Sequence, residues 1–204
     1  YVSGNADSHG GAIYSNNDIL ITADNGRSLF EGNKANGESN AIYMQGDATT
    51  PIDLNLTAVN KGELIINDGI DGSDYNINVL GDGSGVVKFN NIVDHVNKLV
   101  FGNNSVSHIG INAELHAASM NVSDLAIISS HADNSPLITV DVEVDKANNT
   151  VKSGQIFVEN DIDGTYRILV NSLNPDVLDN KEDAIVPFLF APNDDEDTAS
   201  SFMV

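Results

Sequence analysis

The sequence predicts an all-β protein in which short strands are wound as a parallel β-solenoid. Three observations support this. Short apolar runs rich in β-branched residues recur along the chain. Asn, Asp and Gly, which favour turns, lie between the runs. The segment Gly10–Tyr14 returns in similar form as Ser39–Tyr43, a shift of 29 residues that suits one coil of two or three short strands.

Each apolar run is expected to form one strand, because most runs are too short for a helix. Asn91–Val96 and Ala113–Met120 have a trace of helical period, but they lack the length and caps of helices. Very little helix is therefore expected. The expected strands are Ile19–Ile21, Leu64–Ile66, Ile77–Leu80, Val86–Phe89, Lys98–Phe101, Ala126–Ile128, Leu137–Val144, Ile156–Val158, Tyr166–Val170 and Ile185–Phe190.

Many short strands separated by turns are also compatible with an antiparallel sandwich or barrel. The repeat near the N-terminus favours the solenoid, and so does the abundance of Asn, with 27 residues in the chain. Asn side chains at equivalent turns of stacked coils can form hydrogen-bonded ladders along the axis. With no Trp and few aromatic residues, the core is expected to be mainly aliphatic.

The predicted organisation has three parts. Residues 1–135 are expected to form the coils of the solenoid. Residues 136–192, with longer alternating strands such as Ile138–Val144, are expected to form its C-terminal end, a cap or transition region that protects the last edge. Residues 193–204 begin with a run of acidic side chains and are expected to be a solvated linker.

The charge excludes several classes of partner. Lys and Arg number 9 against 30 Asp and Glu, which gives a formal net charge of −21. Such a chain repels nucleic acid and anionic membranes. The absence of Cys excludes disulfides, Cys-ligated zinc and iron–sulfur clusters. Because the chain begins with Tyr1 instead of Met, it is expected to be a piece of a longer protein.

Two motifs near the N-terminus carry a resemblance to a known family. Gly10-Gly11-Ala12-Ile13 followed by Phe30-Glu31-Gly32-Asn33 is similar to the GGA(I/L/V) and FxxN repeat pair of the polymorphic outer membrane proteins, a group of autotransporter surface proteins. The FxxN spacing also occurs at Phe101/Asn104, Phe157/Asn160 and Phe190/Asn193. The rest of the chain resembles more generally the passenger stem of an autotransporter.

The resemblance implies a right-handed parallel β-helix that is exported and displayed on a Gram-negative cell surface, ahead of a C-terminal outer-membrane β-barrel in the parent chain. Its implied role is non-enzymatic: an adhesin, or the stalk of one, with a host or bacterial surface protein or glycan as partner. Self-association is a further possibility, and no cofactor or metal is implied. A purely structural spacer is the other non-enzymatic alternative.

The motif residues also have a structural interpretation. Paired glycines let the backbone turn where a side chain would clash, so Gly10 and Gly11 are expected at a tight turn before Ala12 and Ile13 enter a strand. Phe30 is expected to pack in the core, and Asn33 is expected to cap the turn that follows it.

No residue set for catalysis stands out. Glycoside hydrolysis needs two carboxylates, and a carbohydrate-active β-helix enzyme remains the alternative function, but acids are so abundant that pairs such as Asp161 and Asp163 carry little information. Gly81–Gly85 is expected to be a glycine-rich corner, since it lacks the G-x-S-x-G pattern. The histidines, His9, His95, His108, His116 and His131, have no metal spacing, and Asn67–Asp74 does not match a calcium loop.

Overall fold

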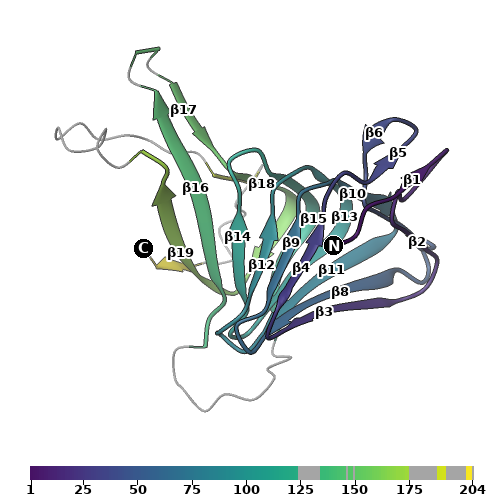
Figure 1. Cartoon of the computed structure of the whole chain (residues 1–204). Coiled ribbons are helices and arrows are strands. Elements are labelled where there is room, and N and C mark those ends of the chain that lie inside the picture. Colours follow the sequence, from purple (N-terminus) through teal and green to yellow (C-terminus); the bar gives the residue numbers. More distant parts are fainter. Residues whose placement is uncertain (124–133, 146, 149, 175–187, 192–200, 204) are drawn as a thin grey trace.

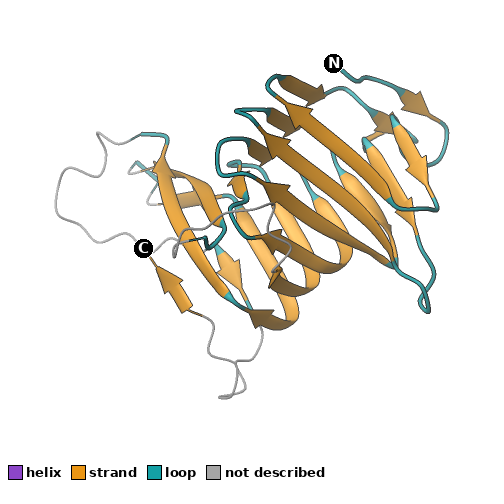
Figure 2. Cartoon of the chain, turned by 90° about the horizontal axis from the view of Figure 1, so that it is seen from below, coloured by secondary structure: helices purple, strands orange, loops and turns teal. Residues whose placement is uncertain are grey.

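The chain forms strands that stack in parallel along one axis, with the two termini at opposite ends of the stack (Figure 2). The structure is a computed structural model that describes residues 1–123, 134–145, 147–148, 150–174, 188–191 and 201–203. Within these ranges there are strands, turns and bends but no helix, so the predicted all-β class is confirmed. It follows that no helix among these residues could cross a membrane.

Three rows of parallel strands make up the stack (Figure 1). Row 1 contains β2 (Ile13–Ser15), β7 (Ile42–Gln45), β10 (Ile70–Ser73) and β20 (Leu189–Phe190), together with the first halves of β13 (Val93–Gly102), β15 (Glu114–Ser123) and β18 (Gln155–Asp163). Row 2 contains β3 (Ile19–Asp24), β8 (Ile52–Val59) and β11 (Tyr75–Gly81), followed by the second halves of β13, β15 and β18. Row 3 contains β4 (Arg27–Phe30), β9 (Glu63–Ile66), β12 (Val86–Phe89), β14 (Val106–Ile109), β16 (Leu137–Asp145), β19 (Thr165–Ser172) and β21 (Ser201–Met203).

The chain visits the three rows in turn and then begins the next coil. Each strand consequently pairs in parallel with the strand that occupies the same place one coil later, such as β3 with β8 and β8 with β11. The shift predicted near the N-terminus is confirmed, because Ile13 pairs with Ile42 and Tyr14 with Tyr43. Parallel pairing of this kind is not that of an antiparallel sandwich.

Four short strands lie beside the rows. β1 (Asn5–Ala6) pairs in parallel with β5 (Lys34–Ala35), which forms a small hairpin with β6 (Glu38–Ser39) near the N-terminal end. Near the other end, β17 (Thr150–Ser153) pairs antiparallel with the second half of β16, and the two strands project from the stack (Figure 1).

The interior consists of ladders of apolar side chains, one step for each coil. In row 1 the inward positions are Ile13, Ile42, Ile70, Val93 and Leu115, aligned by the pairing register. All but Ile13 are nearly fully buried. Burying one such side chain stabilises a fold by about 1.5–3 kcal/mol, so stacked aliphatic ladders hold the coils together. This agrees with the mainly aliphatic core that the composition predicts.

Asparagine serves two purposes at the edges of the rows. The amide of Asn78 donates a 3.0 Å hydrogen bond to Asn55 Oδ1, and that of Asn90 donates a 2.8 Å bond to Asn67 Oδ1, in each case one coil back. The predicted asparagine ladders are therefore confirmed. Asparagines also occupy turns with positive φ, which few other side chains tolerate. Among the described residues these are Asn25, Asn36, Asn60 and Asn104.

The rows of strands extend into the predicted C-terminal part, and one strand lies within the predicted linker. The rows continue without a break past residue 135, because Val106 of β14 pairs with Leu137 of β16 and Leu137 pairs with Arg167 of β19. Ser201–Met203, expected in the acidic linker, form β21 and pair with β19. The rest of that linker lies outside the described residues, as do Ala126–Ile128 and residues 185–187 of the expected strands.

Gly81–Gly85 is a corner between β11 and β12, as the sequence predicts. Its side chains accept hydrogen bonds from the previous coil. The Asp82 carboxylate accepts 2.9 Å hydrogen bonds from the backbone N–H groups of Asn60 and Ser84, and the Ser84 hydroxyl accepts one of 2.9 Å from Lys61 N–H. Burial alone would raise the pKa of Asp82, but these hydrogen bonds outweigh it and lower the pKa to about 2.

We predict that Asp82→Ala lowers the free energy of unfolding by about 1 kcal/mol at neutral pH, or about 3 °C in Tm. The pKa of Asp82 is lower in the folded chain than in the unfolded chain, so its contribution is present above pH 3.8 and disappears as the pH falls towards 2. Thermal melts of both proteins at neutral and acidic pH measure this. A difference in Tm that stays constant down to the lowest pH would contradict the assignment.

Candidate functional site

The outward side chains of row 1 form a line of aromatic and acidic residues parallel to the stacking axis. In the register of the strands, Tyr14 lies next to Tyr43, Tyr43 next to Asp71, His116 next to Phe157, and Phe157 next to Phe190. Asp94 falls between Asp71 and His116, because its neighbour Val93 pairs with both Ile70 and Leu115. We call this line the outer stripe. Its members are Tyr14, Tyr43, Asp71, Asp94, His116, Phe157 and Phe190.

Aromatic rings stack at both ends of the outer stripe. Tyr14 and Tyr43 are parallel within 3°, with ring centroids 5.9 Å apart, and His9 lies 4.3 Å from the Tyr43 ring. At the other end, His116 stacks on Phe157 at 4.6 Å, and Phe157 stacks on Phe190 at 4.7 Å. Tyr14 and Phe190 are 54% and 38% exposed. Aromatic side chains kept at the surface in an ordered line point to contact with a ligand or partner.

The middle of the stripe is acidic, and His95 lies beside its two carboxylates. His95 Nδ1 lies 2.8 Å from Asp71 Oδ1 and 3.8 Å from Asp94 Oδ2, so the two carboxylates are separated by no more than the sum of these distances. His95 has a φ of 57°, which turns the chain between rows 1 and 2 inside β13. The hydroxyl of the buried Tyr75 fixes this bend by donating a 2.6 Å hydrogen bond to the Asp94 carbonyl oxygen.

The acidic surroundings act on the protonation of His95. The hydrogen bond to Asp71 raises the pKa of His95 above its ordinary value of 6.5. Burial opposes this, and the charges of Asp94 and Glu159 raise the pKa further. The acidic cluster therefore favours the protonated form of His95, although 66% of its side chain is exposed.

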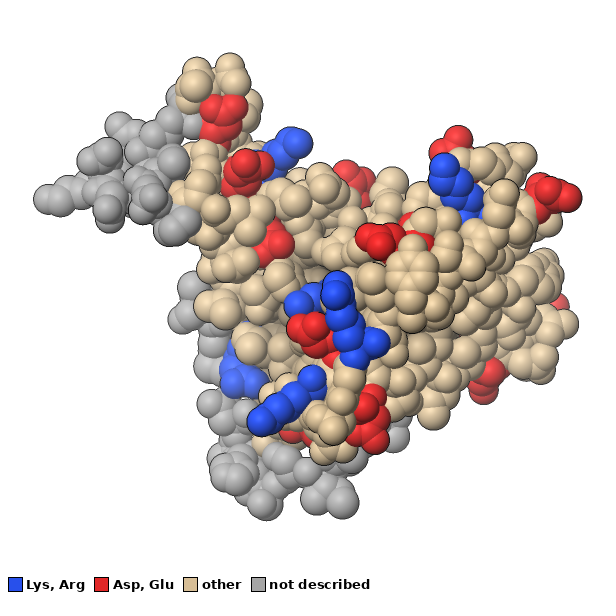
Figure 3. All heavy atoms as spheres, in the orientation of Figure 1, with Lys and Arg blue, Asp and Glu red and all other residues tan. Residues whose placement is uncertain are grey.

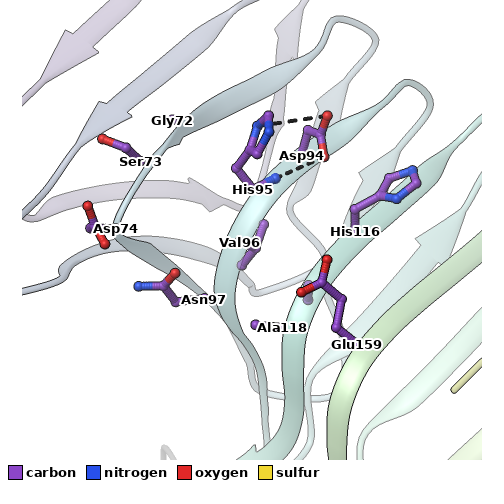
Figure 4. Close-up of a pocket in the computed structure, with 11 residues that line it drawn as sticks. Gly72, Ser73, Asp74, Asp94, His95, Val96, Asn97, His116, Ala118 and Glu159 are labelled. Carbon is purple, nitrogen blue, oxygen red and sulfur yellow. Dashed lines mark hydrogen bonds and ion pairs between the residues drawn. The ribbon is translucent and has the colours of Figure 1, made fainter. Parts of the chain in front are cut away.

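Two cavities lie along the middle of the outer stripe, and Asp94 lines both. One, of about 420 Å³, is surrounded by Asp74, His95, His116 and Glu159, which stand on neighbouring strands in Figure 4. The other, of about 430 Å³, lies beside the β5–β6 hairpin. Its lining includes His9, Glu38, Ser39, Asn40, Asp71 and Asn91. We call the two cavities together the central groove.

No described Lys or Arg lines the central groove. Some of the basic side chains gather instead over row 3, around β4, β9 and β12 (Figure 3). There Lys88 Nζ lies 3.1 Å from Glu63 Oε1. The distribution of charge thus separates a basic region on row 3 from an acidic groove on row 1.

The predicted motif glycines lie at a crowded turn before β2. A Cβ atom on Gly10 would lie 2.0 Å from the Ile13 carbonyl oxygen, and one on Gly11 would lie 2.5 Å from the backbone of Lys34. Gly10 also has a φ of 59°. Ala12 and Ile13 are partly buried and pack against the core. The glycines therefore serve the turn that leads into β2, as the sequence predicts.

The other motif places a buried turn against the next coil. Phe30 is in the core and Asn33 is fully buried. The carboxylate of Asp68, itself only 6% exposed, accepts hydrogen bonds from the backbone N–H groups of Gly32 and Asn33, at 3.1 and 2.9 Å, and from the Asn33 amide at 2.7 Å. Asn33 therefore orders the turn after Phe30, and Asp68 of the next coil accepts hydrogen bonds from the N–H groups of that turn.

The remaining FxxN spacings do not share one environment. Phe101 is buried in the core. Phe157 and Phe190 belong to the outer stripe, so their asparagine spacing does not mark the turn seen at Phe30. Asn193 lies outside the described residues.

The other candidates from the sequence are distributed over the surface or engaged in the fold. Asp68 is occupied by the Asn33 turn, while Asp71 is bound by His95, so Asn67–Asp74 does not gather its carboxylates around one point. His108 Nε2 lies 2.7 Å from Asp141 Oδ1 on row 3. Among the described residues no three His, Cys, Asp or Glu side chains form a group that could hold a metal ion. His131 lies outside these residues.

Comparisons with protein-family models, with curated proteins and with solved structures give no match to the chain. The proposed function is therefore based on the outer stripe and the central groove.

We predict that His95 titrates above pH 6.5 in the folded chain and that Asp71→Asn lowers its pKa towards that value. Because the folded pKa is raised, the pair stabilises the fold below pH 6.5, and this contribution disappears as the pH rises through the folded pKa. An NMR titration of the histidine ring signals in both proteins measures this. A His95 pKa that does not respond to Asp71→Asn would contradict the ion pair.

We predict that Asp68→Ala lowers the free energy of unfolding by about 2 kcal/mol, because it leaves the buried donors of the Asn33 turn without an acceptor. Asp7→Ala removes an exposed carboxylate at the same end of the chain and is the matched control. Urea unfolding followed by circular dichroism measures both changes. Equal stability of the two variants would show that the turn does not depend on Asp68.

Proposed function

We propose that this chain is a segment of a right-handed parallel β-helix from a secreted or surface-displayed autotransporter passenger, and that it acts as a non-enzymatic adhesin or as its stalk. The parallel register of three strand rows supports the β-helix. Parallel strands joined by a crossover within one sheet are right-handed in about 98% of cases, which supports the hand. The GGAI and FxxN motifs at Gly10–Ile13 and Phe30–Asn33 support the family.

The outer stripe is the observation that carries the proposed binding function. A stack of coils is a rigid, extended support, and the stripe presents aromatic and polar side chains along it at one step for each coil. Such an array suits an extended partner that is contacted at several points, such as a glycan or a protein on a host or bacterial surface. Export to the bacterial surface and a β-barrel in the parent chain belong to the same proposal.

The test compares adhesion of the native chain with that of two variants. Tyr14→Ser combined with Phe190→Ser removes the two most exposed rings of the stripe, and is expected to reduce the attachment of chain-coated beads to cultured cells on the order of tenfold. Leu20→Ser combined with Leu169→Ser removes similarly exposed apolar side chains from rows 2 and 3, and is expected to leave attachment unchanged. Equal loss in both variants, or none in either, would count against the stripe.

A carbohydrate-active enzyme is the second candidate, and the pair Asp71 and Asp94 favours it. Their carboxylates lie close to one imidazole, so both can reach a single glycosidic bond, and glycoside hydrolysis uses two carboxyl groups placed in this way. This candidate predicts that the chain shortens a glycan and that Asp94→Asn abolishes the shortening. A panel of host and bacterial glycans, analysed for chain length after incubation, separates the enzyme from the adhesin.

A structural spacer is distinguished by where binding occurs. In that case the isolated chain binds no cell, while the longer parent protein does. The bead experiment with the native chain alone makes this distinction.

A further inference from the structure

The two stacks of rings leave a gap in the outer stripe, and the central groove lies in that gap. Tyr43 and His116, the inner members of the two ring stacks, are separated by three coil steps, or about 14 Å at about 4.8 Å for each coil. Asp71 and Asp94 occupy the two steps between them. The gap is therefore a short trough with carboxylates along its floor, with His9, which packs on Tyr43, at one end and His116 at the other.

The charge of the trough selects the ligand. Asp71, Asp94, Asp74, Glu38 and Glu159 line the central groove, and no described Lys or Arg does so. The groove lies in a chain with a net charge of −21. A ligand with anionic groups is therefore repelled, and one with ammonium groups is attracted.

The His95 imidazole already occupies part of the space beside Asp71 and Asp94 where a ligand ammonium group would bind. Its imidazole lies between the Asp71 and Asp94 carboxylates, although most of the side chain is exposed to solvent. An exposed side chain can move aside without disturbing the core. An ammonium group of a ligand can therefore take the place of the imidazole and keep the two carboxylates paired.

The neutral polar residues of the groove suit a sugar better than a peptide. Ser39, Asn40 and Asn91 line one cavity, and Ser73 and Asn97 line the other. The Asn91 amide already donates a 3.2 Å hydrogen bond to the Ser39 hydroxyl, so these groups are ordered to exchange hydrogen bonds with hydroxyls. Hydroxyl and amide side chains on both sides of the acids match a ligand that carries hydroxyls around each ammonium group.

We propose that the central groove binds an oligosaccharide of amino sugars, with an ammonium group on Asp71 and Asp94 and a sugar ring against His9 or His116. The inference rests on the proposed binding function and gives that function a ligand class. It is independent of the family resemblance, because none of these residues belongs to the GGAI or FxxN motifs.

The test is calorimetric titration of the chain with a glucosamine oligosaccharide and with its N-acetylated counterpart, which has the same rings but no charge. The free amine form is expected to bind at least about tenfold more tightly. Asp71→Asn combined with Asp94→Asn is expected to weaken that binding by at least about tenfold. Asp161→Asn, at an exposed acid on β18 outside the groove, is the matched control and is expected to change nothing.

A second variant tests the displacement of His95. Asn tolerates a positive φ, so His95→Asn keeps the bend in β13 while it removes the internal cation. It is expected to bind the free amine form more tightly than the native chain does. Weaker binding by His95→Asn would mean that the imidazole contacts the ligand directly and would overturn the displacement.

Three other results would contradict the proposed ligand class. The first is equal affinity for the amine and acetylated forms, the second is no binding of the amine form, and the third is tighter binding of a lysine-rich peptide of the same charge. If one of these occurs while Tyr14→Ser with Phe190→Ser still reduces cell attachment, the ligand is wrong and the proposed adhesin function stands. If that variant attaches normally as well, the adhesin function fails too.

Discussion

The parallel register between successive coils is the constraint on which the rest of the structure depends. Backbone hydrogen bonds hold each strand beside its counterpart one coil later, so side chains at equivalent positions lie about 4.8 Å apart. Alternate residues along a strand face opposite sides, and one register therefore produces two kinds of ladder. The inward ladder from Ile42 to Leu115 buries apolar surface, and the outward ladder from Tyr14 to Phe190 collects aromatic and acidic side chains.

The same register explains why neighbouring groups influence one another so strongly in this protein. Asp71 and Asp94 come from different coils and are brought together by the pairing of Ile70 with Val93. Asp68 reaches the Asn33 turn, and Asp82 reaches Asn60, in the same way. Asp68 and Asp82 each accept hydrogen bonds from donors of the coil before, whereas Asp71 interacts with His95 of the coil after it. Polar contacts between coils therefore add to the apolar ladders and make each coil dependent on its neighbour.

The fold could be predicted from the sequence further than the site could. Short β-branched runs, turn residues and the return of Gly10–Tyr14 at Ser39–Tyr43 were sufficient for the all-β class and the first coil-to-coil register. The later coils differ in length: 22 residues separate Val93 from its partner Leu115, and 41 separate Leu115 from Ile156. No fixed spacing connects Tyr43, Asp94 and Phe157, so the outer stripe could not be read from the linear sequence. Phe157 has the same FxxN spacing as Phe30, but Phe30 is buried in the core whereas Phe157 belongs to the outer stripe.

The continuous strands β13, β15 and β18 have a consequence for how this protein can change in length. In these coils the chain passes from row 1 to row 2 within one strand. Because β13 and β15 are paired on both sides, an inserted residue there would disturb two neighbouring coils at once. Elsewhere the chain extends outside the rows, as in the β5–β6 and β16–β17 hairpins. Insertions and deletions are expected to accumulate at those hairpins and to be rare at the bend of β13, which lines the central groove. The surface around the groove could then diversify while the positions of Asp94 and His116 stay fixed.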